Sequence, residues 1–359
     1  MQRGKVLCAM SGGVDSSVTT EILLSQGYSV SGMTMKLFDR DDTESECYSM
    51  PGDIKDASDV ASILQIPWRC INLKEQFDEF IIKPFIQEYC SGRTPNPCIR
   101  CNELIKFSFL LKEADSVGSD FVATGHYART VRLQNERYAL KRAKEKDRDQ
   151  SYFLYRLDQK RLSRILFPLG EFTKTEVRHR AKRLSLKVDS KPDSQEICFI
   201  KNDNYKAYVH KQNVGHENRP GNIIDENGKI LGEHKGIHCF TIGQRRGIGV
   251  SWREPLYVKE IIAESDVVVV GPISSLKSKG LIANEVVWTA GVDLYPSAIY
   301  EVKIRSKHSG AQARVMQTED DQLKVEFLET VYAVSPGQSA VVYLNDEIIC
   351  GGVISKAVP

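Results

Sequence analysis

The chain has 359 residues, of which 41% are hydrophobic and 27% charged, as is typical of globular proteins. This length exceeds what one hydrophobic core usually supports, so we expect two or three domains. No run of about 18 apolar residues occurs and the N-terminus has no apolar signal core, so we expect a cytoplasmic protein with no membrane partner. The net charge is only +2.

The first motif is SGGVDSS at residues 11–17, directly after an apolar run at 5–10 that predicts a β-strand. Paired glycines allow a tight turn close to a ligand, and N–H groups at the start of the following helix suit phosphate oxygens. The loop has no lysine, so it is neither a GxxxxGK[ST] loop nor a GxGxxG dinucleotide loop. It resembles the PP-loop, SGGxDS, of ATP pyrophosphatases, while a plain Gly-rich βα turn is the simpler interpretation.

Strands and helices alternate over the next hundred residues. Strands are predicted at 28–36, 68–73 and 120–125, and helices at 18–26, 52–65, 74–90 with a kink at Pro84, and 102–118. This alternation predicts a doubly wound parallel sheet that binds its ligand at the carboxyl ends of the strands. Met35 and Gly125 fall at such ends, although core packing explains Met35 equally well, and the following His126 is more often a structural residue than a catalyst.

A basic stretch follows, with 19 Lys and Arg against 8 Asp and Glu from residue 129 to 191. Most such runs are solvated faces, but its place beside a nucleotide site favours a polyanionic partner whose binding weakens with salt. A polar hairpin is expected at 130–143, and Thr173 with Glu176 forms a capping box before a helix at 174–185.

The last third changes to short strands with glycine punctuation, which predicts small β-domains or a barrel. These strands are expected at 236–250, 255–262, 266–271, 280–288, 299–306, 312–317, 323–328 and 339–354.

Nine cysteines, an odd number, argue for chemistry at a few thiols instead of a disulfide framework. Cys98 and Cys101 follow two prolines at an expected helix start, where the helix dipole should lower a thiol pKa. CxxC is typical of a redox pair, half a zinc site or part of an iron–sulfur site, and no second CxxC supports a four-cysteine zinc site. Cys198 stands alone, and only the fold can bring it to Cys101. Four others are expected to be small buried hydrophobes: Cys8, Cys70, Cys90 and Cys239.

With these cysteines and the loop on one chain, the sequence closely resembles the bacterial tRNA-specific 2-thiouridylases from end to end. The shared motifs are SGGVDSS, GRTPNPCIRCN, ATGHYAR, DQSYFLY, LFPLGE, DSQEICFI, GQRRGIGV and SPGQSAV. The resemblance implies a PP-loop domain at 1–202, a central tRNA-recognition domain at 203–275 and a β-barrel-like domain at 276–359. It also implies ATP- and Mg²⁺-dependent 2-thiolation of the wobble uridine of tRNAs for Lys, Glu and Gln.

The resemblance further implies roles for individual residues. Cys198 would carry a persulfide received from a sulfur donor protein, and Cys101 would release the sulfur by a transient disulfide. ATP would be bound by Ala9, Met10, Ser11, Gly12, Gly13, Val14, Asp15, Ser16, Met35 and Gly125. The tRNA and its flipped target base would be contacted by Asn96, Pro97, Cys98, His126, Arg148, Asp149, Gln150, Arg305, Ser306 and Gln338.

One departure opens an alternative mechanism. Many relatives have Asp where this chain has Cys98, so Cys98, Cys101 and Cys198 are also candidates for holding a [4Fe–4S] cluster that carries sulfide. Two other functions stay open from the sequence: another PP-loop ligase that adenylates a small molecule, and a non-catalytic tRNA-binding protein.

Overall fold

The computed structural model describes residues 3–38, 52–183, 197–200, 204–212, 219–295 and 297–359. The N-terminal part is built on a five-stranded parallel sheet in the order β3-β2-β1-β4-β7. Its strands are β1 (Lys5–Ala9), β2 (Ser29–Lys36), β3 (Trp68–Asn72), β4 (Phe121–Ala123) and β7 (Ile165–Leu166). Because the order runs outward in both directions from β1 and β4, the loops after these two strands open at one edge, where the sequence predicts the ligand.

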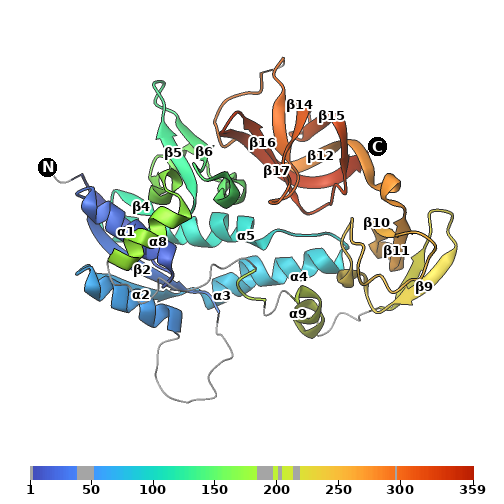
Figure 1. The fold of residues 1–359 in the computed structure, drawn as a ribbon, viewed down its shortest axis with the longest axis horizontal. Helices are drawn as coiled ribbons and strands as arrows, with labels where there is room; N and C mark the ends of the chain where they lie inside the picture. The colour runs from blue at the N-terminus through green and yellow to red at the C-terminus, as the bar shows by residue number, and fades with distance from the viewer. Residues whose placement is uncertain (1–2, 39–51, 184–196, 201–203, 213–218, 296) are drawn as a thin grey trace.

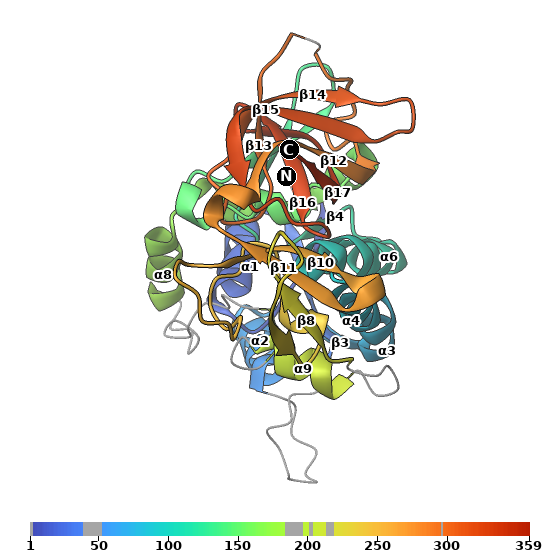
Figure 2. The same cartoon turned by 90° about the vertical axis from the view of Figure 1, so that its right-hand side faces the viewer.

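Helices cover both faces of this sheet, as Figure 2 shows. One face carries α1 (Val14–Ser25), α2 (Gly52–Ile63) and α8 (Lys174–Arg183), which share a core of small and branched side chains. The other carries α3 (Lys74–Phe77), α4 (Lys83–Cys90), α5 (Pro97–Arg100) and α6 (Ser108–Ser116). The doubly wound sheet predicted from the alternation is therefore confirmed. Gly27, with φ +87°, follows α1 as its C′ residue, and its N–H bonds back to the carbonyl of Leu24.

Two helices contain π-helical segments that the sequence does not predict. The segment η1 (Asp78–Ile82) joins α3 to α4, and η2 (Cys101–Phe107) joins α5 to α6. Pro84 lies just after η1, and since it has no N–H to donate, the widened turn before it accommodates the missing bond within one continuous helical run. Segment η2 begins at Cys101. A π-helical turn holds more residues than an α-helical one, so the side chains of η2 point in other directions than an α-helix would give them.

A small mixed sheet lies in the middle of the chain, in the order β10-β11-β8-β9. Its strands are β8 (Gly221–Ile224), β9 (Ile230–His234), β10 (Tyr257–Ile262) and β11 (Val267–Gly271), and α9 (Tyr205–Gln212) precedes them. The strand predicted at 236–250 is wrong: this segment holds one 3₁₀ turn, η7 (Ile237–Cys239), and irregular chain. Four of its glycines have positive φ, which breaks a ladder: Gly236, Gly243, Gly247 and Gly249.

The C-terminal strands form a closed antiparallel barrel, because β12 (Lys277–Val287) pairs with β15 (Leu323–Tyr332) on one side and with β17 (Glu347–Val358) on the other. The remaining strands are β13 (Tyr300–Lys303), β14 (Ala311–Gln317) and β16 (Ser339–Leu344). The predicted barrel is thus confirmed. Figure 1 shows it above α4 and α5, with the small middle sheet at the end opposite the N-terminus.

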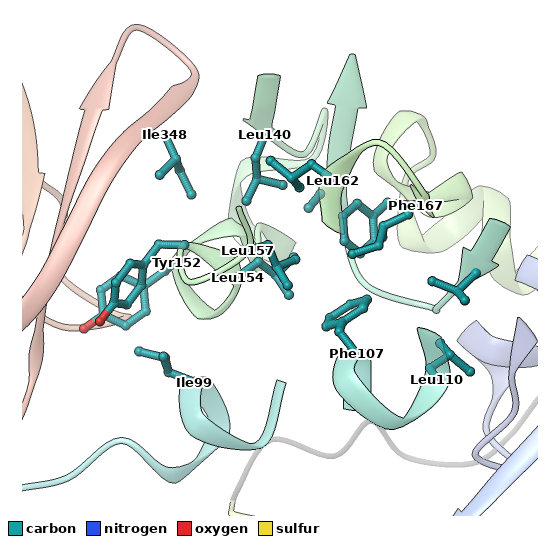
Figure 3. Packing of buried hydrophobic residues seen from close by; sticks show 14 of the residues in the cluster. Ile99, Phe107, Leu110, Leu140, Tyr152, Leu154, Leu157, Leu162, Phe167 and Ile348 are labelled. Atoms are coloured by element: carbon teal, nitrogen blue, oxygen red, sulfur yellow. The ribbon is translucent and has the colours of Figure 1, made fainter. Parts of the chain in front are cut away.

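The predicted polar hairpin is present as β5 (Ala128–Arg132) and β6 (Tyr138–Arg142), and it extends the barrel sheet through a pairing of β6 with β17. Figure 3 shows how one core spans this junction: Ile348 of the barrel approaches Tyr152 and Leu140, while Phe107 and Leu110 close the core from η2 and α6. The sheet that carries the phosphate loop and the barrel are therefore held in a fixed relation by shared apolar packing.

Many cations of the basic stretch are paired inside the molecule. Four from the β5–β6 hairpin bind carboxylates of the barrel, in the pairs Arg129–Asp346, Lys141–Asp346, Arg137–Glu347 and Arg142–Glu301. Part of the charge that the sequence suggests for a polyanion is used to join the hairpin to the barrel. The surface left for a polyanion is thus smaller than the residue count indicates.

Candidate active site

The phosphate loop begins where β1 ends and closes onto the first turn of α1. The N–H of Ser11 donates to Ser16 Oγ at 3.1 Å, and Ser16 Oγ donates to the carbonyl of Gly13 at 3.2 Å. Gly12 has φ +72°, and a Cβ there would lie 2.1 Å from the carbonyl oxygen of Asp53, so only glycine fits. These contacts hold a backbone loop around a helix N-terminus, which is the geometry that binds phosphate.

Three residues expected to bind ATP lie in or beside the loop: Ala9, Met10 and Val14. Ala9 is the last residue of β1, while the side chains of Met10 and Val14 are buried in the core between α1 and α2. The carbonyl of Met10 accepts from Thr34 Oγ1 at 2.8 Å, which ties the loop to β2. The buried side chains of Met10 and Val14 therefore anchor the loop on the core beneath it.

Asp15, the second residue of α1, is bound by a lysine that the loop sequence lacks. Lys174 Nζ lies 2.9 Å from each carboxylate oxygen of Asp15, and Tyr127 Oη donates to Asp15 Oδ1 at 2.9 Å. Lys174 is the first residue of α8 and only 6% exposed. From the sequence, only the capping box of Thr173 and Glu176 indicates that a helix begins at Lys174. The structure confirms this capping box with two reciprocal hydrogen bonds.

Met35 and Gly125 lie at the carboxyl edge of the sheet, as expected. A Cβ on Gly125 would lie 3.0 Å from the N–H nitrogen of Ser16, so glycine allows β4 to end directly against the first turn of α1. Met35 is partly buried and packs against the apolar cluster that includes Cys101.

Cys98 lies in α5 and Cys101 begins η2, but the expected low pKa is wrong for both thiols. Burial raises the pKa of Cys98 and raises that of Cys101 to about 12, while the positive charge of Lys106 opposes the shift at both. The helix start is only four residues long before it widens into η2, and the loss of hydration outweighs its dipole. Lys106 was not identified from the sequence.

Cys198 is exposed and lies within electrostatic range of Cys98 and Cys101, because its charge raises the pKa of both. The next residue, Phe199, anchors it: its ring packs edge to face on Phe77 at 5.6 Å and on Phe85 at 5.4 Å. The fold therefore brings together the three cysteines that the sequence singled out. Phe199 was missed, and the only signal for it is an aromatic residue beside the cysteine.

The other cysteines differ partly from expectation. Cys8 is buried, and Cys90 and Cys239 are half-buried, but Cys70 is exposed on the edge strand β3, so the prediction of a buried residue is wrong there. Because β3 is at the edge of the sheet, it has a neighbouring strand on one side only, and its side chains have fewer neighbours to cover them.

The residues described do not fit an iron–sulfur cluster. Within the described ranges, no three His, Cys, Asp or Glu side chains lie close enough together to hold a metal ion. The three thiols approach one another without forming a ligand set.

Lys106 and His126 connect the cysteines with the phosphate loop. Burial lowers the pKa of His126 to well below its usual value, and the charge of Lys106 lowers it further, so the imidazole is neutral at pH 7. His126 Nδ1 lies 2.7 Å from Thr124 Oγ1, and its ring faces Phe107 at 5.9 Å. Because His126 follows Gly125, the loop, the histidine, the lysine and the thiols form one continuous site.

The segment before Cys98 is held by the barrel. Gln338 Nε2 donates to the carbonyl of Thr94 at 3.0 Å, and the N–H of Thr94 donates to Pro336 at 2.9 Å. Asn96 occupies the N-cap position of α5 without a side-chain cap hydrogen bond, and Pro97 is the buried first residue of that helix. Gln338, expected as a tRNA contact, thus positions the turn that leads into the cysteines.

The three residues at 148–150 expected to contact tRNA all have partners within the protein. Asp149 accepts bonds from the N–H of Ala143 and the hydroxyl of Ser151, and Gln150 Oε1 accepts from the N–H of Tyr127. Arg148 ends a short 3₁₀ turn, η3 (Lys146–Arg148), and is half-buried. Their side chains therefore shape the wall around the site.

Arg305 and Ser306 lie apart from the cysteines, after β13 of the barrel. Arg305 is exposed and lines a hollow together with His308, Gln312 and Tyr332. A cation and an exposed aromatic ring in one hollow suit a nucleic-acid backbone and an unstacked base.

A search of the described helices found none with the length and apolar character to cross a membrane.

Three family models match consecutive parts of the chain. They are described as a tRNA methyl transferase HUP domain at residues 4–202, a tRNA methyl transferase PRC-barrel domain at 210–272 and an aminomethyltransferase beta-barrel domain at 278–354.

Among solved structures, a 4-thiouridine synthetase in complex with RNA and ATP is 18% identical with a TM-score of 0.34, covering 58% of this chain and 50% of that one. Curated relatives match far more closely, and each is named tRNA-specific 2-thiouridylase MnmA. The protein of Carboxydothermus hydrogenoformans is 44% identical over 99% of this chain and 98% of its own, and that of Halothermothrix orenii 43% identical over 98% and 99%. The chain therefore belongs to the family of the tRNA-specific 2-thiouridylases.

Proposed function

We propose that this protein replaces the 2-oxygen of the wobble uridine in tRNAs for Lys, Glu and Gln by sulfur, at the expense of ATP. The observation that supports this best is the approach of Cys198 to Cys98 and Cys101 beside a phosphate loop on the same sheet edge. A ligase that adenylates a small molecule needs no such thiols. We further propose a cytoplasmic location, where the tRNA substrate is found.

In the first step, the O2 atom of the uridine attacks the α-phosphorus of ATP, a bond forms between them, and the bond to the β-phosphate breaks. The uracil N3 loses its proton, and pyrophosphate leaves toward the N–H groups of the loop at residues 11–17. Asp15 and the loop hydroxyls are oxygen donors of the kind that hold Mg²⁺ together with phosphates, and Mg²⁺ would neutralise phosphate charge there. The oxygen of the base can now leave with AMP.

In the second step, the terminal sulfur of a Cys198 persulfide attacks C2 of the base and AMP leaves, which joins the base to Cys198 through two sulfurs. The Cys101 thiol gives up its proton, which restores the proton on the uracil N3, and its sulfur attacks the Cys198 sulfur. The bond between the two sulfurs breaks, the outer one stays on C2, and a Cys101–Cys198 disulfide forms. The two thiols supply the two electrons that reduce the persulfide sulfur, and an external thiol reductant restores them. A persulfide donor protein would reload Cys198.

His126, which is neutral, follows Gly125, and the turn at Asn96 and Pro97 leads into Cys98. We propose that they hold the base, and that Arg148, Asp149, Gln150, Arg305, Ser306 and Gln338 form or support the surface that holds the tRNA.

The test is nucleoside mass spectrometry of tRNA after incubation with the protein, ATP, Mg²⁺ and a persulfide donor. We expect 2-thiouridine at the wobble position with ATP and none without it. Unmodified uridine would contradict the proposal, and tRNA-independent pyrophosphate release with an amino donor would indicate a ligase instead. Anaerobic purification with iron and sulfide analysis tests the cluster mechanism: an active protein that contains iron would overturn the persulfide route.

A further inference from the structure

Four charged side chains form a connected ion-pair network around the helical turn that carries Cys101. Arg156 Nε lies 2.5 Å from Glu103 Oε2, and Arg100 Nη2 lies 2.6 Å from Glu285 Oε2. Two longer contacts close the network, 3.6 Å between Arg156 and Glu285 and 3.8 Å between Arg100 and Glu103. Arg100 precedes Cys101 and Glu103 follows it by two positions, so the network binds the chain on both sides of the cysteine.

The two members of the network outside this helix come from distant parts of the chain. Arg156 follows a 3₁₀ turn, η4 (Ser151–Leu154), and its Nη1 also donates to the backbone carbonyl of Glu285 at 3.3 Å. Glu285 lies in barrel strand β12, where its φ of +50° is in the left-handed region that residues other than glycine rarely adopt. The pairing of β12 with β17 shifts register across this residue, and such a bulge re-aims a side chain. The barrel therefore presents the Glu285 carboxylate to the helix.

Segment η2 is π-helical, a rare form of helix, and side-chain contacts hold it. Asn102 Nδ2 donates to the carbonyl of Phe153 at 3.0 Å, and Arg156 Nε donates to the Glu103 carboxylate. Ser108 Oγ donates to the carbonyl of Glu103 at 2.6 Å. Two of these three contacts come from one short segment outside the helix, so that segment fixes the turn.

The form of η2 decides which side chains face each other. Cys101 and Lys106 are five positions apart, which is about one turn of a π-helix but well over one turn of an α-helix. An α-helical η2 would therefore rotate the ammonium away from the thiol. In the π-helical form, the charge of Lys106 acts on Cys101 and on the neighbouring Cys98.

Stability alone does not account for the pair of Arg156 and Glu103. Their side chains are 10% and 14% exposed, so both lose hydration, and an apolar pair of similar volume often stabilises a protein as well. The best-attested use of such a pair is to select one register over another. Here the two registers are the π-helical and α-helical forms of the turn that begins at Cys101.

We propose that Arg156 is a positioning residue for the Cys101 thiol: by binding Glu103 and the barrel residue Glu285, it keeps η2 in the π-helical form that aims this thiol at Cys198. It acts through Cys101 in the step that frees the sulfur. In that step a bond forms between the sulfurs of Cys101 and Cys198, the bond from Cys198 to the outer sulfur breaks, and the thiol proton goes to the uracil N3. The inference rests on the proposed function and adds to it the residue that aims the resolving thiol.

The experiment is a single-turnover reaction of the full-length protein, loaded with a persulfide on Cys198, with tRNA, ATP and Mg²⁺. Arg156→Met leaves the Glu103 carboxylate without this partner, so the double variant Arg156→Met/Glu103→Leu, which makes both side chains apolar, is tested beside it. In both we expect the covalent enzyme–tRNA adduct to accumulate and release of 2-thiouridine to slow about 10- to 100-fold, as misplacement of a reacting group does. Adenylation should stay within about twofold of the wild-type rate.

The matched control replaces another ion pair on the same helical run. Arg69 and Glu113, which lies in α6, are 2.6 Å apart. The double variant Arg69→Met/Glu113→Leu should release 2-thiouridine at the wild-type rate with no accumulated adduct.

Amide hydrogen exchange of the free protein tests the helix form without tRNA, ATP or a sulfur donor. Exchange across η2 should be about tenfold faster in both Arg156 variants and unchanged in the control. Wild-type release of 2-thiouridine or unchanged exchange in the folded double variant would overturn the inference. Equal slowing of adenylation and release, or failure of the double variant to fold, would overturn it too, since the network would then be structural. A wild-type protein that forms no 2-thiouridine would contradict the proposed function, and the exchange rates would still decide whether Arg156 holds η2.

Discussion

In the phosphate loop, the fixing hydrogen bonds join residues a few positions apart, such as Ser11 and Ser16. In the cysteine region, by contrast, Cys198 meets Cys98 from a separate segment that is held by aromatic packing of Phe199. Short-range hydrogen bonds therefore shape much of the loop, which Thr34 and Lys174 also bind from distant positions, whereas the thiol arrangement depends on the tertiary fold alone. The two regions should respond to substitution in different ways, and each prediction below separates them.

The largest effect is expected for Cys198→Ala, because it removes the sulfur carrier and leaves the loop untouched. Thiolation should fall by more than about 1,000-fold, while ATP-dependent adenylation of the tRNA persists. The exposed Cys70→Ala is the control and should retain both activities. Loss of adenylation in Cys198→Ala would show that the two regions are not separable.

The second effect concerns thiol reactivity. Because burial raises the pKa of Cys101 to about 12, iodoacetamide should alkylate it at least about 100-fold more slowly than the exposed Cys198 at pH 7.5. The Cys101 rate should rise about tenfold per pH unit, since the thiolate fraction does. Peptide mass spectrometry over time measures both, and equal rates would contradict the burial of Cys101.

The same pKa shift acts on stability with a definite sign. The unfolded thiol ionises near its ordinary pKa of about 8.5, and the folded one near 12. Above about pH 8.5 the unfolded state therefore holds fewer protons, so the free energy of unfolding should fall as the pH rises toward 12.

A third prediction concerns the anchor of the sulfur carrier. Phe199→Ala removes the ring contacts that place Cys198, so thiolation should fall about 30-fold, as misplacement of a reacting group does, with ATP affinity unchanged. Phe80→Ala, on η1 and 40% exposed, is the control. Thiolation at the wild-type rate would show that Cys198 is positioned by other contacts.

The smallest effect is expected in the loop. Gly12→Ala forces a side chain onto φ +72° and against the Asp53 carbonyl, which should weaken ATP binding about tenfold and cost about 2 kcal/mol of stability. Gly52→Ala, whose Cβ would meet nothing within 4 Å, should do neither. Unaltered ATP binding in the first variant would place the nucleotide elsewhere.

The parallel sheet, most of its helices, the hairpin and most barrel strands were predictable, because hydrophobic periodicity and glycine positions are local properties. The turn and helix start of the loop at residues 11–17 were predictable for the same reason, while the reactive roles of Cys98, Cys101 and Cys198 stay predictions. Lys174, Lys106 and Phe199 were not, since each acts on residues distant in sequence. The thiol pKa values were predicted with the wrong sign, because burial is decided by the fold and outweighs the local helix start.

The same limit explains the error at 236–250, where glycines with positive φ replace the expected strand. It also explains why the basic stretch at 129–191 offers less free charge than expected. Carboxylates of the barrel, far away in the sequence, neutralise part of it.

The central claim is that the sulfur reaches the base through Cys198 and is released by Cys101, and a single-turnover reaction of Cys101→Ala tests it directly. With ATP, Mg²⁺ and persulfide-loaded protein, this variant should accumulate a covalent enzyme–tRNA adduct that a thiol reductant cleaves to 2-thiouridine. Formation of 2-thiouridine at the wild-type rate, with no adduct, would contradict the account.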